Sequence, residues 1–168
     1  MRPNKPLPEP RRRVVALFAV ATLLFGVARA QMGPIEDLAA FPHGKLQVAE
    51  GKKVKHTLEV WLADSPGRQA QGLMFVRSLP SLRGMLFVHE SPEPMSMWMK
   101  NTYIPLDMVF IDGHGRIQQI VEQTTPHSLS IITSDEPALA VLEIAGGEAK
   151  RLELHPGQRV IHPALAGH

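Results

Sequence analysis

Residues 106–123, LDMVFIDGHGRIQQIVEQ, contain the clearest structural signal in the sequence. Two runs rich in apolar and β-branched residues, 106–111 and 116–123, flank the glycine-bearing segment 112–115. Runs of this kind, joined by a short turn that contains glycine, predict an antiparallel hairpin. The stretch therefore favours a β-rich fold.

Further strands are predicted on both sides of this hairpin. Residues 54–62 alternate apolar and polar side chains, which is the period of a half-buried strand. Trp61 falls on the otherwise polar face of this strand, so we expect it to be covered by another element or to form part of a binding surface. Other β-rich segments predict strands at residues 84–88, 95–99, 130–132, 138–144 and 159–162.

Two short helices are predicted between the strands. Asp64 or Ser65, followed by Pro66, predicts a helix start, because a side-chain oxygen caps free N–H groups and proline fits the first turn. The helix is predicted over residues 68–75, and a single helical turn within residues 146–152. Many short strands with little helix predict a mainly β fold, either a sandwich or a partly open barrel with one or two short helices.

The predicted domain covers residues 45–163. Residues 31–44 carry Gly33, Pro34 and Pro42 without sustained periodicity, so they are predicted to form a flexible N-terminal arm. Residues 164–168 form a short C-terminal tail. A chain of this length can bury enough apolar surface for one domain, and no internal repeat is visible.

The first thirty residues have the layout of a secretory signal peptide. Arg11, Arg12 and Arg13 precede an uncharged apolar run over residues 14–28, which ends in the small-residue pattern at residues 28–30. The apolar run is shorter than the roughly 20 residues that a membrane-spanning helix needs. We therefore expect cleavage after Ala30, export to the periplasm or the medium, and no stable membrane anchor; an uncleaved N-terminal anchor is the alternative.

Charge and cysteine content exclude several classes of function. The whole chain holds 18 Lys and Arg against 16 Asp and Glu, but residues 31–168 hold 12 against 15, a net charge of −3. The basic character of the chain thus belongs to the predicted signal and gives no reason to expect nucleic-acid binding. The absence of cysteine excludes disulfides, thiolate metal sites and thiol nucleophiles.

One polar run resembles a known family. Residues 98–107 read WMKNTYIPLD, and residues 72–74 (GLM), 84–87 (GMLF), 142–143 (LE) and 145–146 (AG) accompany them, together with Arg68. This pattern resembles the family catalogued as domain of unknown function 192 (UPF0127), over about residues 46–161. The resemblance implies a mainly β, jelly-roll-like sandwich with one or two short helices. The name of the family leaves its biochemistry unassigned.

The polar residues of these motifs are the candidate ligand-binding site. A cation, an amide, a hydroxyl and carboxylates of this kind suit a small polar ligand if the strands bring them to one end of the sheet. The alternative is a structural network, since buried polar groups need partners with or without a ligand. The predicted ligand-binding residues are Arg68, Trp98, Lys100, Asn101, Thr102, Asp107 and Glu143.

Two other chemistries remain open. Asp107 and Glu143 are the alternative catalytic pair, as acid and base of an exported hydrolase, if burial tunes their pKa values. The thioethers of Met95, Met97 and Met99 would share one face of a strand and are soft ligands that suit Cu(I). Methionine is also a flexible filler of apolar cores, which explains the same pattern without a metal.

The sequence favours a non-catalytic binding or accessory module of the cell envelope. We expect a small polar or saccharide-like ligand, or an envelope protein, as the partner. Trp98 or Trp61 would supply an apolar platform for it. No cofactor is predicted, and the protein is expected to be a monomer.

Overall fold

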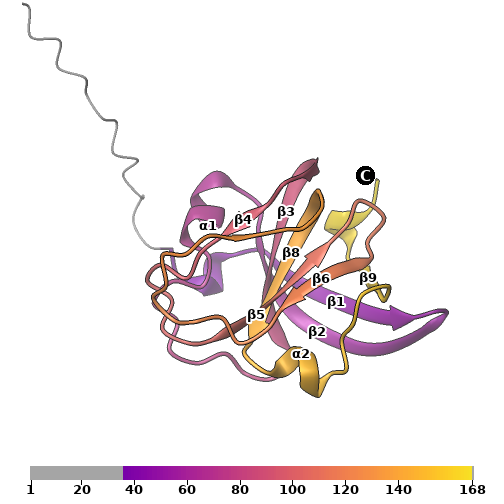
Figure 1. Cartoon of the computed structure of the whole chain (residues 1–168), viewed down its shortest axis with the longest axis horizontal. Helices are drawn as coiled ribbons and strands as arrows, with labels where there is room; N and C mark the ends of the chain where they lie inside the picture. The colour runs from indigo at the N-terminus through magenta and orange to yellow at the C-terminus, as the bar shows by residue number, and fades with distance from the viewer. Residues whose placement is uncertain (1–35, 168) are drawn as a thin grey trace, which may run out of the picture. The chain divides into compact units, whose positions relative to one another are not determined.

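A seven-stranded mixed sheet dominates the molecule (Figure 1). The computed structural model describes residues 36–167. The strand order is β6-β5-β8-β3-β2-β1-β9, and β4 and β7 form a separate two-stranded sheet. The strands are β1 (His43–Glu50), β2 (Lys53–Ala63), β3 (Arg83–Glu93), β4 (Ser96–Met97), β5 (Leu106–Ile111), β6 (Ile117–Val121), β7 (Ile132–Thr133), β8 (Ala138–Ala145) and β9 (Arg159–Ile161).

The predicted hairpin is confirmed as β5 and β6. Asp112 organises its turn, because its Oδ1 accepts the backbone N–H groups of His114 and Arg116, both at 2.8 Å. Gly115 has a φ of +73°, a conformation that glycine adopts without steric cost. All six residues of β5 are buried, so this strand lies inside the protein on both faces.

The sheet curls until its two edge strands meet. Arg116, just before β6, forms an isolated bridge with Arg159 of β9. The backbone N–H of Ile117 donates to the carbonyl of Gln158 at 2.9 Å, and that of Val160 donates to Gly115 at 2.7 Å. This contact is local, so the sheet does not close into a full barrel. The predicted mainly β fold, a sandwich or a partly open barrel, is confirmed as a mixed seven-stranded sheet that is not a closed barrel.

A parallel pair, β2 with β3, breaks the antiparallel pattern. Its connection contains helix α1 (Pro66–Gln71), whose N-cap Ser65 accepts the N–H of Arg68. The helix ends earlier than the predicted residue 75, since Gly72 has a φ of +51° and Phe75 a φ of +66°. The second helix is α2 (Glu148–Arg151), within the predicted helical turn.

Two apolar clusters cover the opposite faces of the sheet. One contains Val109, Leu142 and Ile144, and the other contains Met108, Val141 and Phe87. Alternate residues of the central strands β5 and β8 therefore point into different layers. Which layer a polar residue enters depends on its position in this alternation.

The ordered domain begins earlier than predicted. A short 3-10 helix, η1 (Leu38–Ala40), precedes β1, and Phe41 is buried in the core. Residues 36–44, which were predicted to be part of a flexible arm, are thus packed against the domain. A second 3-10 helix, η2 (Pro163–Leu165), ends the chain.

Two further expectations concern the strand at residues 95–99 and the N-terminal segment. The strand predicted over residues 95–99 is only two residues long. The predicted signal peptide over residues 1–30, and residues 31–35 of the arm, lie outside the described residues. Within residues 36–167, no helix is both long enough and apolar enough to cross a bilayer.

Candidate functional site

A cleft of about 200 Å³ opens on the methionine-rich face of the sheet. One wall is formed by α1 and the residues that follow it, and the other by the segment from Met95 to Lys100 that contains β4. In Figure 1, α1 and β4 lie near the end of β3. Four of the seven predicted ligand-binding residues line this cleft: Trp98, Lys100, Thr102 and Glu143.

Glu143 forms the floor of the cleft. It lies on the central strand β8, directly opposite Met85 of β3 and Met108 of β5. Its exposed fraction is only 4%. No hydrogen bond or ion pair to its carboxyl group exists within residues 36–167, although every fully buried side-chain nitrogen or oxygen in that range has a partner. The carboxyl group therefore keeps its small exposed surface toward the cleft.

Burial alone changes the acidity of this carboxyl group. It raises the pKa of Glu143 to about 8, because the charged form is poorly solvated and no neighbouring charge compensates it. At neutral pH the side chain is mainly protonated and can donate a hydrogen bond. An unpaired, strongly perturbed acid in a cleft is typical of functional sites.

The rim of the cleft carries an aromatic residue and a cation. Trp98 is 45% exposed, and the Nζ atom of Lys100 lies 5.0 Å from the centroid of its ring. Thr102 is buried, and its hydroxyl donates to the carbonyl oxygen of Lys100 at 3.4 Å. These contacts hold Lys100 at the cleft through its ammonium group and its backbone carbonyl.

Asp107 does not belong to this cleft. Its neighbour Met108 pairs with Glu143, so the alternation of the strand places the Asp107 side chain on the other face of the sheet. There its Oδ1 accepts the N–H groups of Gln123 at 2.8 Å and Gly147 at 3.0 Å, and its Oδ2 accepts that of Ala149 at 2.8 Å. Asp107 thus fixes the start of α2 and the segment after β6.

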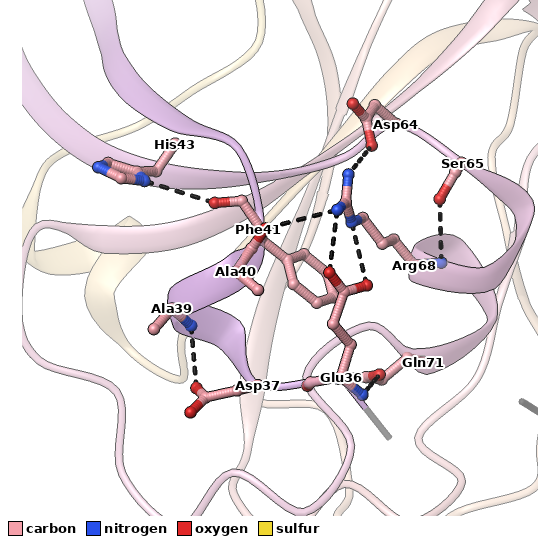
Figure 2. Close-up of polar contacts among 10 residues, drawn as sticks. All are labelled: Glu36, Asp37, Ala39, Ala40, Phe41, His43, Asp64, Ser65, Arg68 and Gln71. Atoms are coloured by element: carbon pink, nitrogen blue, oxygen red, sulfur yellow. Dashed lines mark hydrogen bonds and ion pairs between the residues drawn. The ribbon is translucent and has the colours of Figure 1, made fainter. Parts of the chain in front are cut away.

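Arg68 likewise has a structural position (Figure 2). Its guanidinium group donates to both carboxylate oxygens of Glu36, at 2.9 and 3.2 Å, and to Asp64 at 2.9 Å. These partners raise the pKa of Arg68, so it remains charged. The guanidinium group also lies over the ring of Phe41, at 5.3 Å from its centroid. Arg68 therefore fastens the N-terminal segment to α1 and does not line the cleft.

Asn101 supports the rim from outside the cleft. It adopts a φ of +58°, and its carbonyl oxygen accepts the N–H of Phe75 at 2.9 Å. Its side-chain amide contacts the sulfur of Met74 at 3.8 Å. Asn101 shapes the turn between Lys100 and Thr102 without facing the ligand space.

The methionines divide between the cleft and the core. Met95 and Met97 line the cleft, together with Met74. Met99 is fully buried, and its sulfur accepts the hydroxyl of Thr124 at 3.1 Å. Met99 does not line the cleft with the other two, so the predicted three-sulfur set is not assembled there.

Some lining residues were missed by the sequence analysis. Gln69, Met74 and His89 line the cleft. His89 is paired with Glu93. Met74 lies in the GLM motif, which could have indicated it, but nothing in the sequence brings residues 69–74 to the same cleft as residues 95–102. Trp61, the alternative apolar platform, lines a different hollow, together with Arg83. The guanidinium group of Arg83 lies 5.7 Å from the centroid of the Trp61 ring.

Comparison with known proteins shows what this chain is similar to. The model of the DUF192 family, described as "Uncharacterized ACR, COG1430", matches residues 46–162. A candidate transcription regulator from Sinorhizobium meliloti 1021 is 41% identical, with 74% of this chain and 96% of that one covered and a TM-score of 0.70. A protein of unknown function from Novosphingobium aromaticivorans DSM 12444 is 33% identical, with 76% and 91% covered and a TM-score of 0.71. The search of curated proteins finds no match.

Proposed function

This chain belongs to the DUF192 family, and we propose that it is a non-catalytic module that binds a small polar molecule in the cleft above Glu143. We further propose that it works as an exported monomer in the periplasm or the medium, because residues 1–30 have the layout of a cleaved signal. The seven-stranded sheet provides a rigid scaffold for the cleft.

The unpaired carboxyl group of Glu143 is the observation that carries the binding proposal. The carboxyl group is almost fully buried and keeps only a small exposed surface, so it loses most of its hydration without gaining a protein partner, which costs free energy. An apolar residue would fit between Met85 and Met108 at no such cost. A ligand that pairs with the carboxyl group would compensate this penalty and gain affinity from it.

Size and lining set the class of ligand. The cleft volume of about 200 Å³ is below the roughly 300–1,000 Å³ of sites for drug-sized ligands. Lys100 and Thr102 supply polar groups to the lining, and Trp98 supplies an apolar surface. These features favour a single compact molecule over a polymer chain.

Other functions have weaker support from the geometry. The hydrolase alternative needs Asp107 and Glu143 in one cleft, and they lie on opposite faces of the sheet. The relative from Sinorhizobium meliloti is described as a candidate transcription regulator. Nucleic-acid binding usually requires a basic surface, and residues 31–168 hold 12 Lys and Arg against 15 Asp and Glu.

A thermal-shift screen tests the proposal. Residues 31–168, which contain both apolar clusters of the core, would be screened against monosaccharides, amino acids, amines, small carboxylic acids and Cu(I). A ligand at 100 times its dissociation constant should add about 2.7 kcal/mol to the free energy of unfolding. The shift should shrink in Glu143→Gln and Lys100→Ala, and should persist in Lys52→Ala on the distant β1–β2 turn.

The negative outcomes are equally informative. If no compound raises the melting temperature, or if the shift is the same in all variants, the cleft is not the binding site. A shift confined to Cu(I) would instead support the methionine site.

A further inference from the structure

We infer that the ligand is a small zwitterion with an apolar side chain, such as a free amino acid, whose ammonium group pairs with Glu143 and whose anionic group pairs with Lys100. This inference rests on the proposed function and names the chemical class that the same cleft accepts. The cleft holds one acid on its floor and one cation at its rim, and the two are not paired with each other.

The floor of the cleft favours a cation. The groups directly opposite Glu143 on β3 and β5 are the neutral side chains of Met85 and Met108. The nearby wall of α1 and its following turn contributes no charged side chain to the lining, and the two other titratable groups of the cleft are His89 and Lys100. His89 is already paired with Glu93. An incoming ammonium group would therefore be the counter-charge that Glu143 lacks within residues 36–167.

The rim of the cleft favours an anion. No ion pair in the described part of the chain involves Lys100. Its Nζ atom lies instead over the ring of Trp98, and the half-buried lysine cannot reach full hydration there. A carboxylate on the ligand would pair with this cation at the entrance while the ammonium group lies below it.

The other lining residues of the cleft favour an apolar side chain on the ligand. Met74, Met97 and Phe87 line the cleft together with Glu143 and Lys100. Thioethers and an aromatic ring contact an alkyl or thioalkyl side chain favourably, and methionine adapts its shape to different ligands. A monosaccharide fits this arrangement less well, because it has neither an ammonium group for Glu143 nor an anionic group for Lys100.

Binding of a cation should also release a proton. Since Glu143 is mainly protonated in the free protein at neutral pH, it must ionise in order to pair with an ammonium group. A ligand that only accepts a hydrogen bond from the neutral carboxyl group would release none. Proton release therefore separates the two modes of recognition by the same residue.

Isothermal titration of residues 31–168 with leucine, two of its derivatives and a monosaccharide tests the inference. N-acetyl-leucine lacks the ammonium group, leucinamide lacks the carboxylate, and a monosaccharide lacks both. Leucine should bind at least about tenfold more tightly than each of the others. Titrations in two buffers that differ in ionisation enthalpy should show release of close to one proton at pH 7.

Two variants separate the two ends of the ligand. Glu143→Gln should weaken leucine at least about tenfold and abolish the proton release. Lys100→Met should weaken leucine but leave leucinamide unchanged, because only leucine carries the anion. Lys52→Met is the matched control at a distant exposed lysine and should change nothing. Thermal unfolding of each variant checks that it is folded.

The outcomes distinguish the inference from the function on which it rests. Equal or tighter binding of N-acetyl-leucine or the monosaccharide, with loss in Glu143→Gln, would overturn the zwitterion and keep the cleft as a binding site. Equal binding of leucinamide and leucine would overturn the role of Lys100. No binding by any compound of this titration and of the wider screen would reject both proposals.

Discussion

Two buried carboxyl groups on neighbouring strands of one sheet have opposite environments. Asp107 accepts three backbone N–H groups and holds α2 in place. Glu143 has no such donor among residues 36–167 and faces the cleft. Aspartate and glutamate have almost the same chemistry, so the two environments differ because the side chains of Asp107 and Glu143 lie on opposite faces of the sheet. At the residue scale, one carboxyl group supports the fold and the other is available to a ligand.

The stability of the protein should fall as pH rises, because of Glu143. In the folded protein its pKa is about 8, whereas the ordinary value is 4.5. Between these values the folded state binds the proton more tightly, so its stabilising effect is complete at low pH and is lost toward pH 8. Between pH 5 and pH 8 this amounts to a loss on the order of 4 kcal/mol.

Urea unfolding of wild type and Glu143→Gln from pH 5 to pH 9 measures this loss. The free energy of unfolding should decline with pH in wild type, and Glu143→Gln should lack this decline, so the variant is the more stable protein at pH 9. Glu122→Gln, at an exposed position, should follow wild type. Parallel curves for wild type and Glu143→Gln would mean that Glu143 titrates normally.

Asp107→Asn should destabilise the protein although it keeps the size of the side chain. The amide retains one acceptor oxygen and turns an NH₂ group toward backbone N–H donors. An unsatisfied buried group costs about 1–3 kcal/mol, and disruption of the start of α2 adds to this. Chemical denaturation should show the loss. An unchanged midpoint would indicate that water replaces the lost contacts.

At the scale of elements, the close approach of β3 and β8 places Glu143. Gly84 of β3 lies opposite Ile144. A Cβ atom at Gly84 would lie 2.5 Å from the backbone oxygen of Glu143 and 3.0 Å from the Cγ2 atom of Ile144. The absence of a side chain at this position allows the two strands to pair at the floor of the cleft.

Gly84→Ala should therefore destabilise the sheet. The nearest obstacle is backbone and cannot move aside as a side chain can, so we expect a loss of about 1–3 kcal/mol or more. Thermal unfolding measures it. Gly67→Ala in α1 is the matched control, because a Cβ atom there meets nothing within 4 Å. It should be neutral or stabilising by up to about 1 kcal/mol. Equal melting temperatures for the two variants would contradict this account.

At the scale of the whole molecule, the charges of the chain fall into two parts. Six of its 18 Lys and Arg lie in residues 1–30, and residues 31–168 have a net charge of −3. This distribution fits a basic export signal in front of an acidic domain.

Expression of the full chain in a Gram-negative host tests the export proposal. The protein recovered from the periplasm should begin at Gln31, as intact mass would show. Ala30→Leu should block cleavage and leave the longer chain bound to membranes, because signal peptidase requires a small residue at this place. A full-length protein in the cytoplasm would contradict the proposal.

The sequence by itself determined the strands of the hairpin, the strand at residues 54–62 and most of the other strand positions, because these depend on local periodicity and turn chemistry. It also identified the family, through the motif at residues 98–107 and the shorter motifs that accompany it. It also indicated four residues of the cleft: Trp98, Lys100, Thr102 and Glu143. Trp98, Lys100 and Thr102 lie in one continuous run that shares a turn, so their proximity needed no knowledge of distant pairing.

Only the tertiary structure decided which polar residues meet. The parallel pairing of β2 with β3 and the insertion of β8 between β3 and β5 join segments far apart in the chain. The pairing register of β5 and β8 then places Glu143 on the cleft face and Asp107 on the other face. Glu143 pairs with Met108, the residue after Asp107, and side chains alternate between the two faces with a period of two. Because β5 is buried on both faces, its apolar run does not alternate with polar residues, and the sequence of the strand does not predict which side chains face the cleft.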